Sequence, residues 1–455
     1  MAIQVEQLRA AVAAEMPQIV SDLESLVRIP SFANEEGPSP AVAQSAQHVL
    51  DLVKAAGLTS ARIVQVPDSD GQLGGPAILA HQPGPPGAPT VLLYAHHDVQ
   101  PVADDWSTDP FEPTTKDGRL FGRGTADDGA GVVTHLAVLR ILRDRLPVGV
   151  VLLIEGEEEI GSPTFERILE RYSDELRSDV AVVADSDNWA AGVPALTTSL
   201  RGLAELKVTL TVAEYQTHSG MFGGPVLDAA LLMARLISTL HNDQGEVAVE
   251  GLAATGSSPV DYPVERFRRE AGLLDSVQLA GSGSLADALW FKPAISVIGF
   301  DAPRSSQTTN AIQPSAAAVI SLRVPPGADA QAAAEKLGQH LQNHVEFGAH
   351  LEIQYGASGS GFLADTSGPA GQAAKWALTT AFGQDVVQTG QGGSIPLANY
   401  LAQAFPGMEI LITGMEDPSS RAHSGDESVD LGMLEKVVLA EVLLLERLAT
   451  GGTAE

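Results

Sequence analysis

The amino-acid sequence predicts an α/β fold: a mixed, mostly parallel β-sheet flanked by helices, with an inserted α+β domain. The chain has 455 residues, and because a domain usually has about 100–200 residues, we expect more than one. Short apolar runs alternate with segments of helical spacing, which is typical of a parallel sheet with helical connections. The pattern changes near residues 203 and 364, so the predicted domain segments are 1–202, 203–364 and 365–455.

The first and third segments contain the runs that predict the main sheet. Each run is short, apolar and followed directly by polar residues, as expected of a buried parallel strand. These strands are predicted over residues 90–94, 148–154, 180–184 and 409–413. Apolar residues that recur every three or four positions predict helices over 5–27, 41–56, 130–145, 369–382 and 428–448.

The segment 203–364 has a different texture, which predicts a separate α+β domain. Strands are predicted over 204–212 and 317–324, and helices over 226–241 and 328–345. The Gly/Ser-rich stretch 356–361 is predicted to be a flexible return to the first domain.

Composition excludes several classes of function. With 57 acidic and 27 basic residues the formal charge is −30, which disfavours nucleic acid and anionic membrane surfaces as partners. No apolar run reaches the roughly 18–20 residues of a membrane span. The absence of cysteine excludes disulfides, thiolate metal sites and a cysteine nucleophile. The first residues lack the features of a signal peptide, so we expect a cytoplasmic protein.

Carboxylates and imidazoles follow the predicted strands, where an open parallel sheet binds its ligands. They are His96, His97 and Asp98; Glu155 and Glu157 to Glu159; Asp185 and Asp187; and His423, with Asp127 and Asp128 in a glycine-rich loop before a predicted helix. Taken singly, each has an ordinary interpretation as a solvated charge, a helix cap or a loop histidine. Crowded at one sheet edge, however, like charges require cations.

This donor set suits two divalent ions, with zinc, manganese and cobalt as candidates, and such sites catalyse hydrolysis. The carboxylate of Asp98 is placed to accept the second N–H of His96 and fix its tautomer. Rival motifs are absent: the sequence has no His-Glu-x-x-His, no Gly-x-Ser-x-Gly and no Gly-Lys pair.

The motifs at residues 95–101, 122–128 and 155–162 occur in the order found in a known superfamily of dinuclear zinc peptidases. The chain resembles the carnosinase, glutamate carboxypeptidase and desuccinylase superfamily, and it is most similar to its carnosinase-like dipeptidases. The similarity continues through residues 200–202, 218–224, 392–396 and 422–424. The resemblance implies a catalytic domain formed by 1–202 and 365–455, with 203–364 as a lid that mediates dimerisation.

The resemblance also implies the metal ligands. His96, Asp127 and Asp185 would hold one ion, and Asp127, Glu159 and His423 the other, so that Asp127 bridges the two. Asp187 is the alternative to Asp185, because Ser186-Asp187-Asn188 imitates the same motif locally.

Further roles follow from the same resemblance. Glu158 would be the general base for a metal-bridged hydroxide, with Asp98 beside the metals, and a lid histidine, His218, would assist from the partner subunit. Arg323 would bind the C-terminal carboxylate of the substrate, with Asn310 and Ser394 as further contacts. The chain departs from the family at Gly129, where a lysine is common, at Gly390-Gln391, and in the segment 356–362, which lacks the histidine of carnosinases.

The function implied is that of a cytoplasmic, homodimeric metallopeptidase that hydrolyses dipeptides with a free C-terminal carboxylate, using two metal ions per subunit, zinc first. One alternative keeps the metal site but acts on N-acyl amino acids, as a deacylase or desuccinylase. A remote alternative is a non-catalytic binding or scaffold protein.

Overall fold

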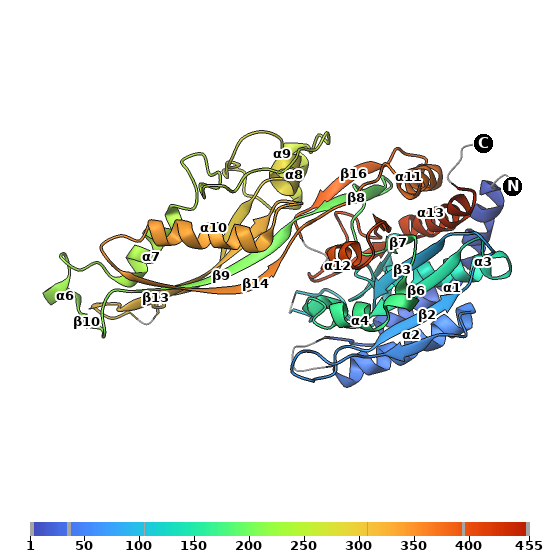
Figure 1. Cartoon of the computed structure of the whole chain (residues 1–455), viewed down its shortest axis with the longest axis horizontal. Coiled ribbons are helices and arrows are strands. Elements are labelled where there is room, and N and C mark those ends of the chain that lie inside the picture. Colours follow the sequence, from blue (N-terminus) through green and yellow to red (C-terminus); the bar gives the residue numbers. More distant parts are fainter. Residues whose placement is uncertain (1–3, 34–37, 104, 307, 394–395, 452–455) are drawn as a thin grey trace. The chain divides into compact units, whose positions relative to one another are not determined.

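The fold was established from a computed structural model, which describes residues 4–33, 38–103, 105–306, 308–393 and 396–451. The chain forms two compact units. Unit 1 comprises Met1–Thr198, Ala364–Thr389 and Pro396–Glu455, and unit 2 comprises Ser199–Leu363 and Gly390–Ile395. Figure 1 labels many of the elements of both units.

A mixed sheet forms the centre of unit 1, in the strand order β1-β2-β6-β3-β7-β17-β8, with β16 paired to β8. Strand β3 is parallel to β6 and β7, and β17 is parallel to β7, which confirms the predicted mostly parallel sheet. The strands are β1 (Arg62–Val64), β2 (Ala77–Gln82), β3 (Thr90–His96), β6 (Gly149–Glu155), β7 (Val180–Val183), β8 (Ala195–Leu200), β16 (Val387–Gln391) and β17 (Glu409–Ile412).

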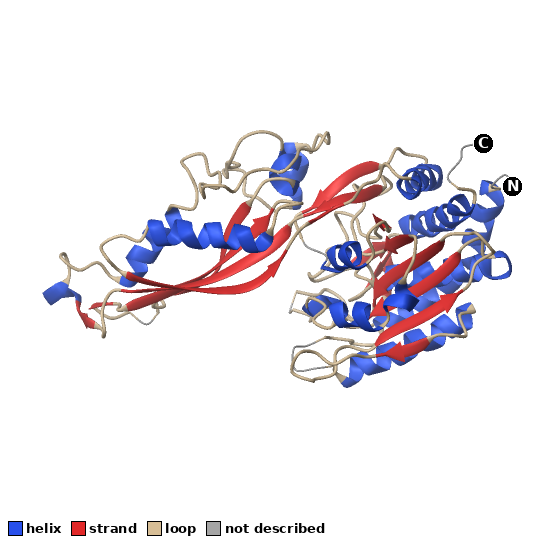
Figure 2. Cartoon of the chain, in the orientation of Figure 1, coloured by secondary structure: helices blue, strands red, loops and turns tan. Residues whose placement is uncertain are grey.

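Helices cover both faces of this sheet (Figure 2). On one face α1, α2, α3, α11 and α13 share a continuous apolar core with the strands. On the other face Tyr94 of β3 makes an edge contact with Phe165 of α4, which stacks on Tyr400 of α12. The helices are α1 (Val5–Val27), α2 (Pro40–Ala56), α3 (Gly129–Leu142), α4 (Phe165–Arg171), α5 (Ser173–Leu176), α11 (Pro369–Phe382), α12 (Pro396–Ala404) and α13 (Leu431–Ala449).

Side-chain caps fix where several of these helices begin. The hydroxyl of Ser39 accepts the N–H of Val42 at the start of α2, and Asp430 accepts the N–H of Met433 at the start of α13. The predicted helix over 428–448 was wrong at its beginning. Ser428–Asp430 instead form β18, which pairs with β5 (Arg119–Phe121), and β5 pairs in turn with β4 (Thr114–Lys116).

Unit 2 contains an antiparallel sheet in the order β11-β13-β9-β14. Buried residues alternate along β9, and α7 and α10 pack on the buried face (Figure 1). The four strands are β11 (Ala294–Asp301), β13 (Ser315–Val324), β9 (Gly202–Thr211) and β14 (His350–Gly359). The other elements are β10 (Thr217–His218), β12 (Ala311–Ile312), β15 (Phe362–Leu363), α6 (Ser219–Phe222), α7 (Ala229–Ser238), α8 (Val264–Glu270), α9 (Leu285–Trp290) and α10 (Ala330–Asn343).

The stretch 356–361, predicted to be flexible, is largely part of a strand. Gly356 to Gly359 end β14, where Ser358 pairs with Ala204 after a register shift that follows Tyr355. Pairing with β9 supplies the hydrogen bonds that offset the low strand propensity of glycine. Across the described part of the chain, we find no helix with both the length and the apolar character to span a membrane.

Candidate metal centre

The predicted metal ligands of unit 1 lie together at one edge of its sheet. His96 ends β3, Asp185 lies just beyond β7, and Glu158 and Glu159 lie beyond β6. Because these parallel strands end at the same edge, their following residues converge. Two groups have ligand atoms within 4.8 Å of one another: a first ligand group of His96, Glu158 and Asp185, and a second ligand group of Asp127, Glu159 and His423.

Asp127 connects the two groups. Its Oδ1 lies 3.0 Å from Nε2 of His96, and its Oδ2 lies 2.9 Å from Nε2 of His423. Nε2 of His423 also lies 3.3 Å from Oε2 of Glu159. Each carboxylate oxygen of Asp127 therefore faces the histidine of a different group, which is the arrangement a bridging carboxylate needs.

The charges of these side chains strongly perturb one another. Burial and the charge of Asp127 raise the pKa of Asp185 to about 7. Desolvation and the charge of Asp185 raise the pKa of Glu158 well above its usual value. Hydrogen bonds with Asp127 and Glu159 raise the pKa of His423 to about 10. Without cations, protons must therefore neutralise part of the cluster.

The residues present fit divalent metal ions. Four carboxylates and two imidazoles, with no thiolate, form a donor set that suits zinc, manganese or cobalt. The shared position of Asp127 between the groups suits a pair of ions. The positive charge of two bound ions would relieve the repulsion that raises the pKa values of Asp185 and Glu158.

Asp98 supports the site differently from the predicted hydrogen bond. Nδ1 of His96 lies 3.1 Å from the backbone carbonyl oxygen of Asp98, and 3.5 Å from its carboxylate Oδ1. The nearer acceptor for the second N–H of His96 is thus the backbone. The buried carboxylate instead accepts the backbone N–H groups of Glu158 and Glu159, at 3.2 and 3.0 Å. Asp98 therefore ties the end of β3 to the loop after β6.

The alternative between Asp185 and Asp187 has a clear geometric outcome. Asp185 belongs to the first ligand group, whereas neither group, within the described ranges, includes Asp187. Asp187 is exposed, and its backbone forms an isolated parallel β-bridge with the backbone of Glu416. One further difference concerns the first group, which contains Glu158 where the resemblance implied Asp127.

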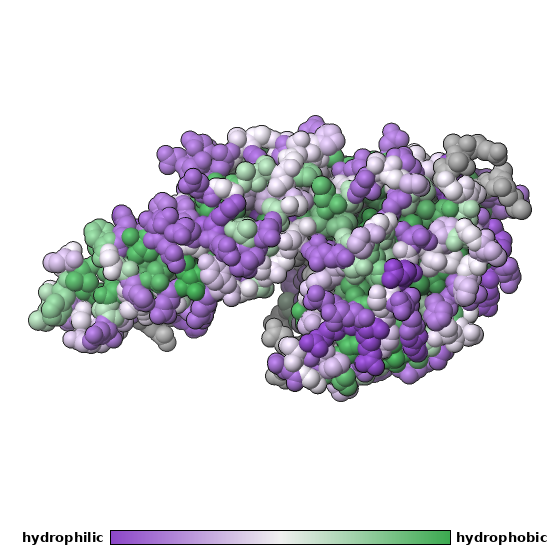
Figure 3. Space-filling view, in the orientation of Figure 1, coloured by the Kyte–Doolittle hydropathy of each residue, from purple (hydrophilic) through white to green (hydrophobic). Residues whose placement is uncertain are grey.

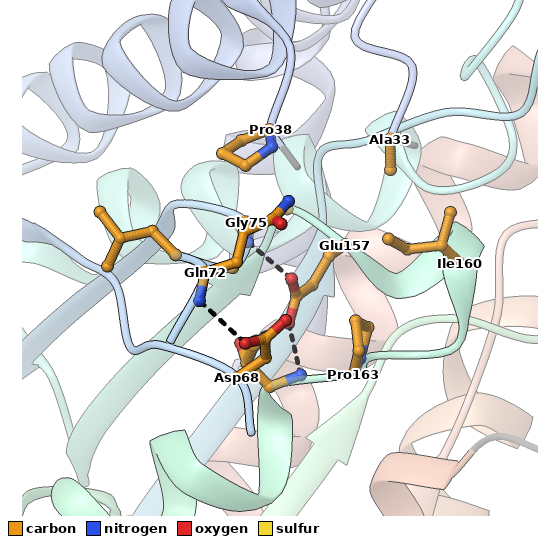
Figure 4. A pocket seen from close by; sticks show the side chains of 12 residues that line it. Ala33, Pro38, Asp68, Gln72, Gly75, Glu157, Ile160 and Pro163 are labelled. Atoms are coloured by element: carbon orange, nitrogen blue, oxygen red, sulfur yellow. Dashed lines mark hydrogen bonds between the residues drawn. The ribbon is translucent and has the colours of Figure 1, made fainter. Parts of the chain in front are cut away.

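Two acidic residues next to the ligands have structural contacts. Glu157 is buried and accepts the backbone N–H groups of Gly75 and Thr164, at 2.6 and 2.8 Å. It lines a cavity of about 280 Å³ with Asp68, and Figure 4 shows the hydrogen bonds that hold it there. Asp128 caps α3 by accepting the N–H of Gly131 at 3.1 Å. Their neighbours Glu158 and Asp127 are thereby aimed at the metal centre.

Sequence reasoning missed three residues that contact the ligands or their loops. Nε2 of Gln100 donates to Oε2 of Glu159 at 2.9 Å, and Arg123 and Glu427 form a buried ion pair beside Asp127. Gln100 and Arg123 stood within the motifs already noted. Glu427 follows His423 by four positions, and only its contacts distinguish it from other acids.

The remaining predicted residues belong to unit 2. His218 is exposed, and the N–H of the next residue, Ser219, donates to the backbone oxygen of Asn310 at 3.0 Å, so His218 and Asn310 are neighbours. Arg323 is half-buried on β13, opposite Leu203 of β9. Ser394 lies outside the described residues.

Comparison with known proteins identifies the family. The model of peptidase family M20/M25/M40 matches residues 92–447. A cysteinylglycine-S-conjugate dipeptidase of Corynebacterium striatum is 36% identical, over 79% of this chain and 81% of the relative. A Beta-Ala-His dipeptidase of Rattus norvegicus is 28% identical, over 80% and 78% of the two chains.

The fold is also that of known structures. The solved structure of a dipeptidase from Saccharomyces cerevisiae superposes with a TM-score of 0.83 at 22% identity, covering 100% of both chains. This likeness confirms the fold class, and the resemblance noted from the motifs is confirmed by the family match. On the strength of that match over most of its length, the chain belongs to peptidase family M20/M25/M40 and is a metallopeptidase.

Proposed function

We propose that the protein hydrolyses dipeptides with a free C-terminal carboxylate at a site that holds two divalent metal ions. The observation that carries this proposal is the pair of ligand groups joined by Asp127 at the carboxyl edge of the sheet. The relatives are named as dipeptidases, which favours dipeptides over N-acyl amino acids as substrates. Cytoplasmic location remains an expectation from the sequence.

In this proposal His96 and Asp185 hold one ion, Glu159 and His423 hold the other, and Asp127 holds both. Zinc is the first choice, because imidazole and carboxylate ligands bind it more tightly than manganese. When bound, such ions lower the pKa of a water molecule and polarise the scissile carbonyl group. The buried Asp98 keeps Glu158 and Glu159 oriented through their backbone N–H groups.

Glu158 is the proposed general base. Its carboxylate is half-buried, and desolvation together with the charge of Asp185 raises its pKa. A carboxylate with raised proton affinity can take a proton from the attacking water and hand it to the leaving amine. Glu158 also lies within ligand distance of His96 and Asp185, so the metal content of a Glu158 variant distinguishes a general base from a ligand.

Unit 2 supplies the proposed contacts to the substrate. Arg323 has the planar fork that pairs with a carboxylate, and His218, with Asn310 beside it, would donate to the developing oxyanion in this proposal. Along β13, Arg323 and Ser315 are eight residues apart, and His218 lies beyond the Ser315 end of the ladder. Eight strand residues span roughly 27 Å, much more than the roughly 3.5 Å per residue of a dipeptide.

Arg323 and His218 of one chain therefore cannot contact the same dipeptide, which supports a homodimer in which a second copy provides His218. The surface around His218 suits such an interface. Tyr215, Met221 and Phe222 are 70%, 75% and 51% exposed, and Figure 3 shows apolar residues gathered over α6 and α7. Large exposed apolar residues that cluster in this way are typical of protein interfaces.

The test measures amine release by metal-reconstituted protein from unmodified dipeptides and from N-acetyl and N-succinyl amino acids. We expect faster cleavage of the dipeptides. Glu158→Gln should keep both metal ions but lose turnover, while Glu166→Gln, which changes an exposed glutamate of α4, should behave as the wild type. Preference for acylated substrates would overturn the substrate assignment, and loss of a metal ion from Glu158→Gln would make Glu158 a ligand.

A further inference from the structure

The side chain of Glu427 forms hydrogen bonds with the backbone of the loop that carries the proposed ligand Asp127. Its side chain is 0% exposed. Oε1 accepts the backbone N–H groups of Ala126 and Asp127, at 2.9 and 3.1 Å. Oε2 accepts one hydrogen bond from Nη1 of Arg123, at 2.7 Å, and another from the backbone N–H of Gly124, at 3.0 Å. A carboxylate has about four acceptor positions, so all of them are used on one short loop.

The same residue belongs to the loop that carries His423. The backbone oxygen of Glu427 accepts the N–H of Gly122 at 3.0 Å, and His423 lies four residues before Glu427. The backbone of Glu427 therefore connects one end of the loop that carries His423 to the glycine-rich loop. The side chain of Glu427 holds the backbone of Asp127. Glu427 thus joins the loops that supply two of the three residues of the second ligand group.

Arg123 completes this connection. Its side chain is 2% exposed, its Nη2 lies 3.3 Å from the backbone oxygen of Pro101, and its guanidinium sits 5.4 Å from the ring centre of Trp106. The positive charge of Arg123 offsets part of the cost of burying the carboxylate of Glu427. Charge-assisted bonds of this kind hold their geometry better than neutral ones.

We infer that Glu427 is a positioning residue, which holds Asp127 and His423 in register so that the second ligand group is assembled before a metal ion binds. The inference rests on the proposed metal centre. The carboxylate of Glu427 accepts its hydrogen bonds from Arg123 and from backbone N–H groups of the loop rather than from a proposed ligand side chain, so its effect should appear in metal affinity. Removing such an outer contact typically weakens metal binding about 10- to 100-fold.

The decisive variant is Glu427→Gln, which keeps the size of the side chain. Its amide nitrogen would face either the N–H groups of Ala126 and Asp127 or those of Arg123 and Gly124, so two hydrogen bonds would be replaced by donor–donor contacts. The matched control is Glu441→Gln. Glu441 is also a buried glutamate, 5% exposed, but it pairs with His135 and not with a ligand loop.

The experiment strips the full-length protein of metal and titrates zinc against a chromogenic chelator, alongside the thermal unfolding of the metal-free protein. We expect Glu427→Gln to bind at least one of two zinc ions about 10- to 100-fold more weakly than the wild type. Glu441→Gln should lower the unfolding temperature and leave zinc affinity within threefold, that is within about 0.7 kcal/mol.

Equal zinc affinity of the wild type and Glu427→Gln would overturn the inference, as would equal losses in both variants. If Glu427→Gln does not fold, Glu427→Asp replaces it. That side chain keeps its charge but is one methylene too short to reach all four donors, and it should weaken zinc binding in the same direction. If the wild type itself binds fewer than two zinc ions, the proposed metal centre fails instead.

Discussion

A buried ion pair between α3 and α13 allows a sharp prediction about stability. Nδ1 of His135 lies 2.8 Å from Oε1 of Glu441, and Nε2 of His135 lies 3.0 Å from the backbone oxygen of Tyr94. Both ring nitrogens thus have an acceptor, which suits the doubly protonated imidazolium. Burial opposes this charge, but Glu441 outweighs it and raises the pKa of His135 above its usual value.

The cost of breaking this pair follows from its burial, since His135 is 0% and Glu441 5% exposed. Glu441→Leu removes the partner of Nδ1 of His135, so burial makes the neutral imidazole the favoured form and leaves one ring nitrogen without a partner, which costs about 1–3 kcal/mol. Glu441→Gln keeps an acceptor but loses the charge, so we expect it to cost about 1–2 kcal/mol. The double variant with His135→Leu and Glu441→Leu should recover most of the loss, because no buried ring nitrogen is left without a partner.

The pH dependence has a definite sign. Because the folded-state pKa of His135 is raised, the stabilisation is complete below the unfolded-state pKa of about 6.5 and is lost as the pH rises through the folded-state pKa. Urea unfolding followed by tryptophan fluorescence should therefore show the stability difference between wild type and Glu441→Gln narrowing as the pH rises above about 6.5. A difference that stays constant over this rise, or a loss below about 1 kcal/mol for Glu441→Leu, would refute the ion-pair argument.

Three further predictions concern the proposed site. Chelation of the metal ions should abolish dipeptide hydrolysis. Zinc, manganese and cobalt are then added singly, and the recovery of amine release is measured. Activity that persists in the chelated protein would contradict a metal mechanism. Arg323→Ala should raise the KM for dipeptides at least about 10-fold with a smaller effect on kcat, because a charge-assisted bond to the substrate carboxylate is lost, and an unchanged KM would argue against this contact. In Asp98→Asn the amide nitrogen would face the backbone N–H of either Glu158 or Glu159, so one of these two hydrogen bonds is lost. Zinc affinity measured by chelator competition should then fall about 10-fold, while the far-UV circular dichroism stays unchanged.

The sequence identified the elements whose signals are local. The runs that became β3, β6, β7 and β17 are uninterrupted apolar segments, and parallel strands of this kind need both faces buried. Once these strands were placed, the residues following them had to share one edge of the sheet. That reasoning placed His96 and Asp185 among the candidates, together with Asp187, without any knowledge of side-chain contacts.

The errors arose where pairing between distant segments decided the outcome. Ser428–Asp430 form a strand because β5, about three hundred residues earlier, supplies its partner. Gly356 to Gly359 lie in β14 because β9 pairs with them. In both places the local pattern favoured another structure, and the long-range hydrogen bonds overrode that preference.

The acidic residues of the centre show why the sequence alone could not separate ligands from supports. Glu157 and Glu158 are adjacent and chemically identical, as are Asp127 and Asp128. Glu157 and Asp128 each accept at least two backbone N–H groups, whereas no backbone N–H of the described residues donates to Glu158 or Asp185, which both belong to the first ligand group. A carboxylate whose oxygens are already occupied by backbone donors has little capacity left for a cation, and one without donors in a desolvated site gains most from binding it. The number of donors that each oxygen accepts, which only the fold determines, therefore distinguishes the acids that can serve the metals from those that hold the loops in place.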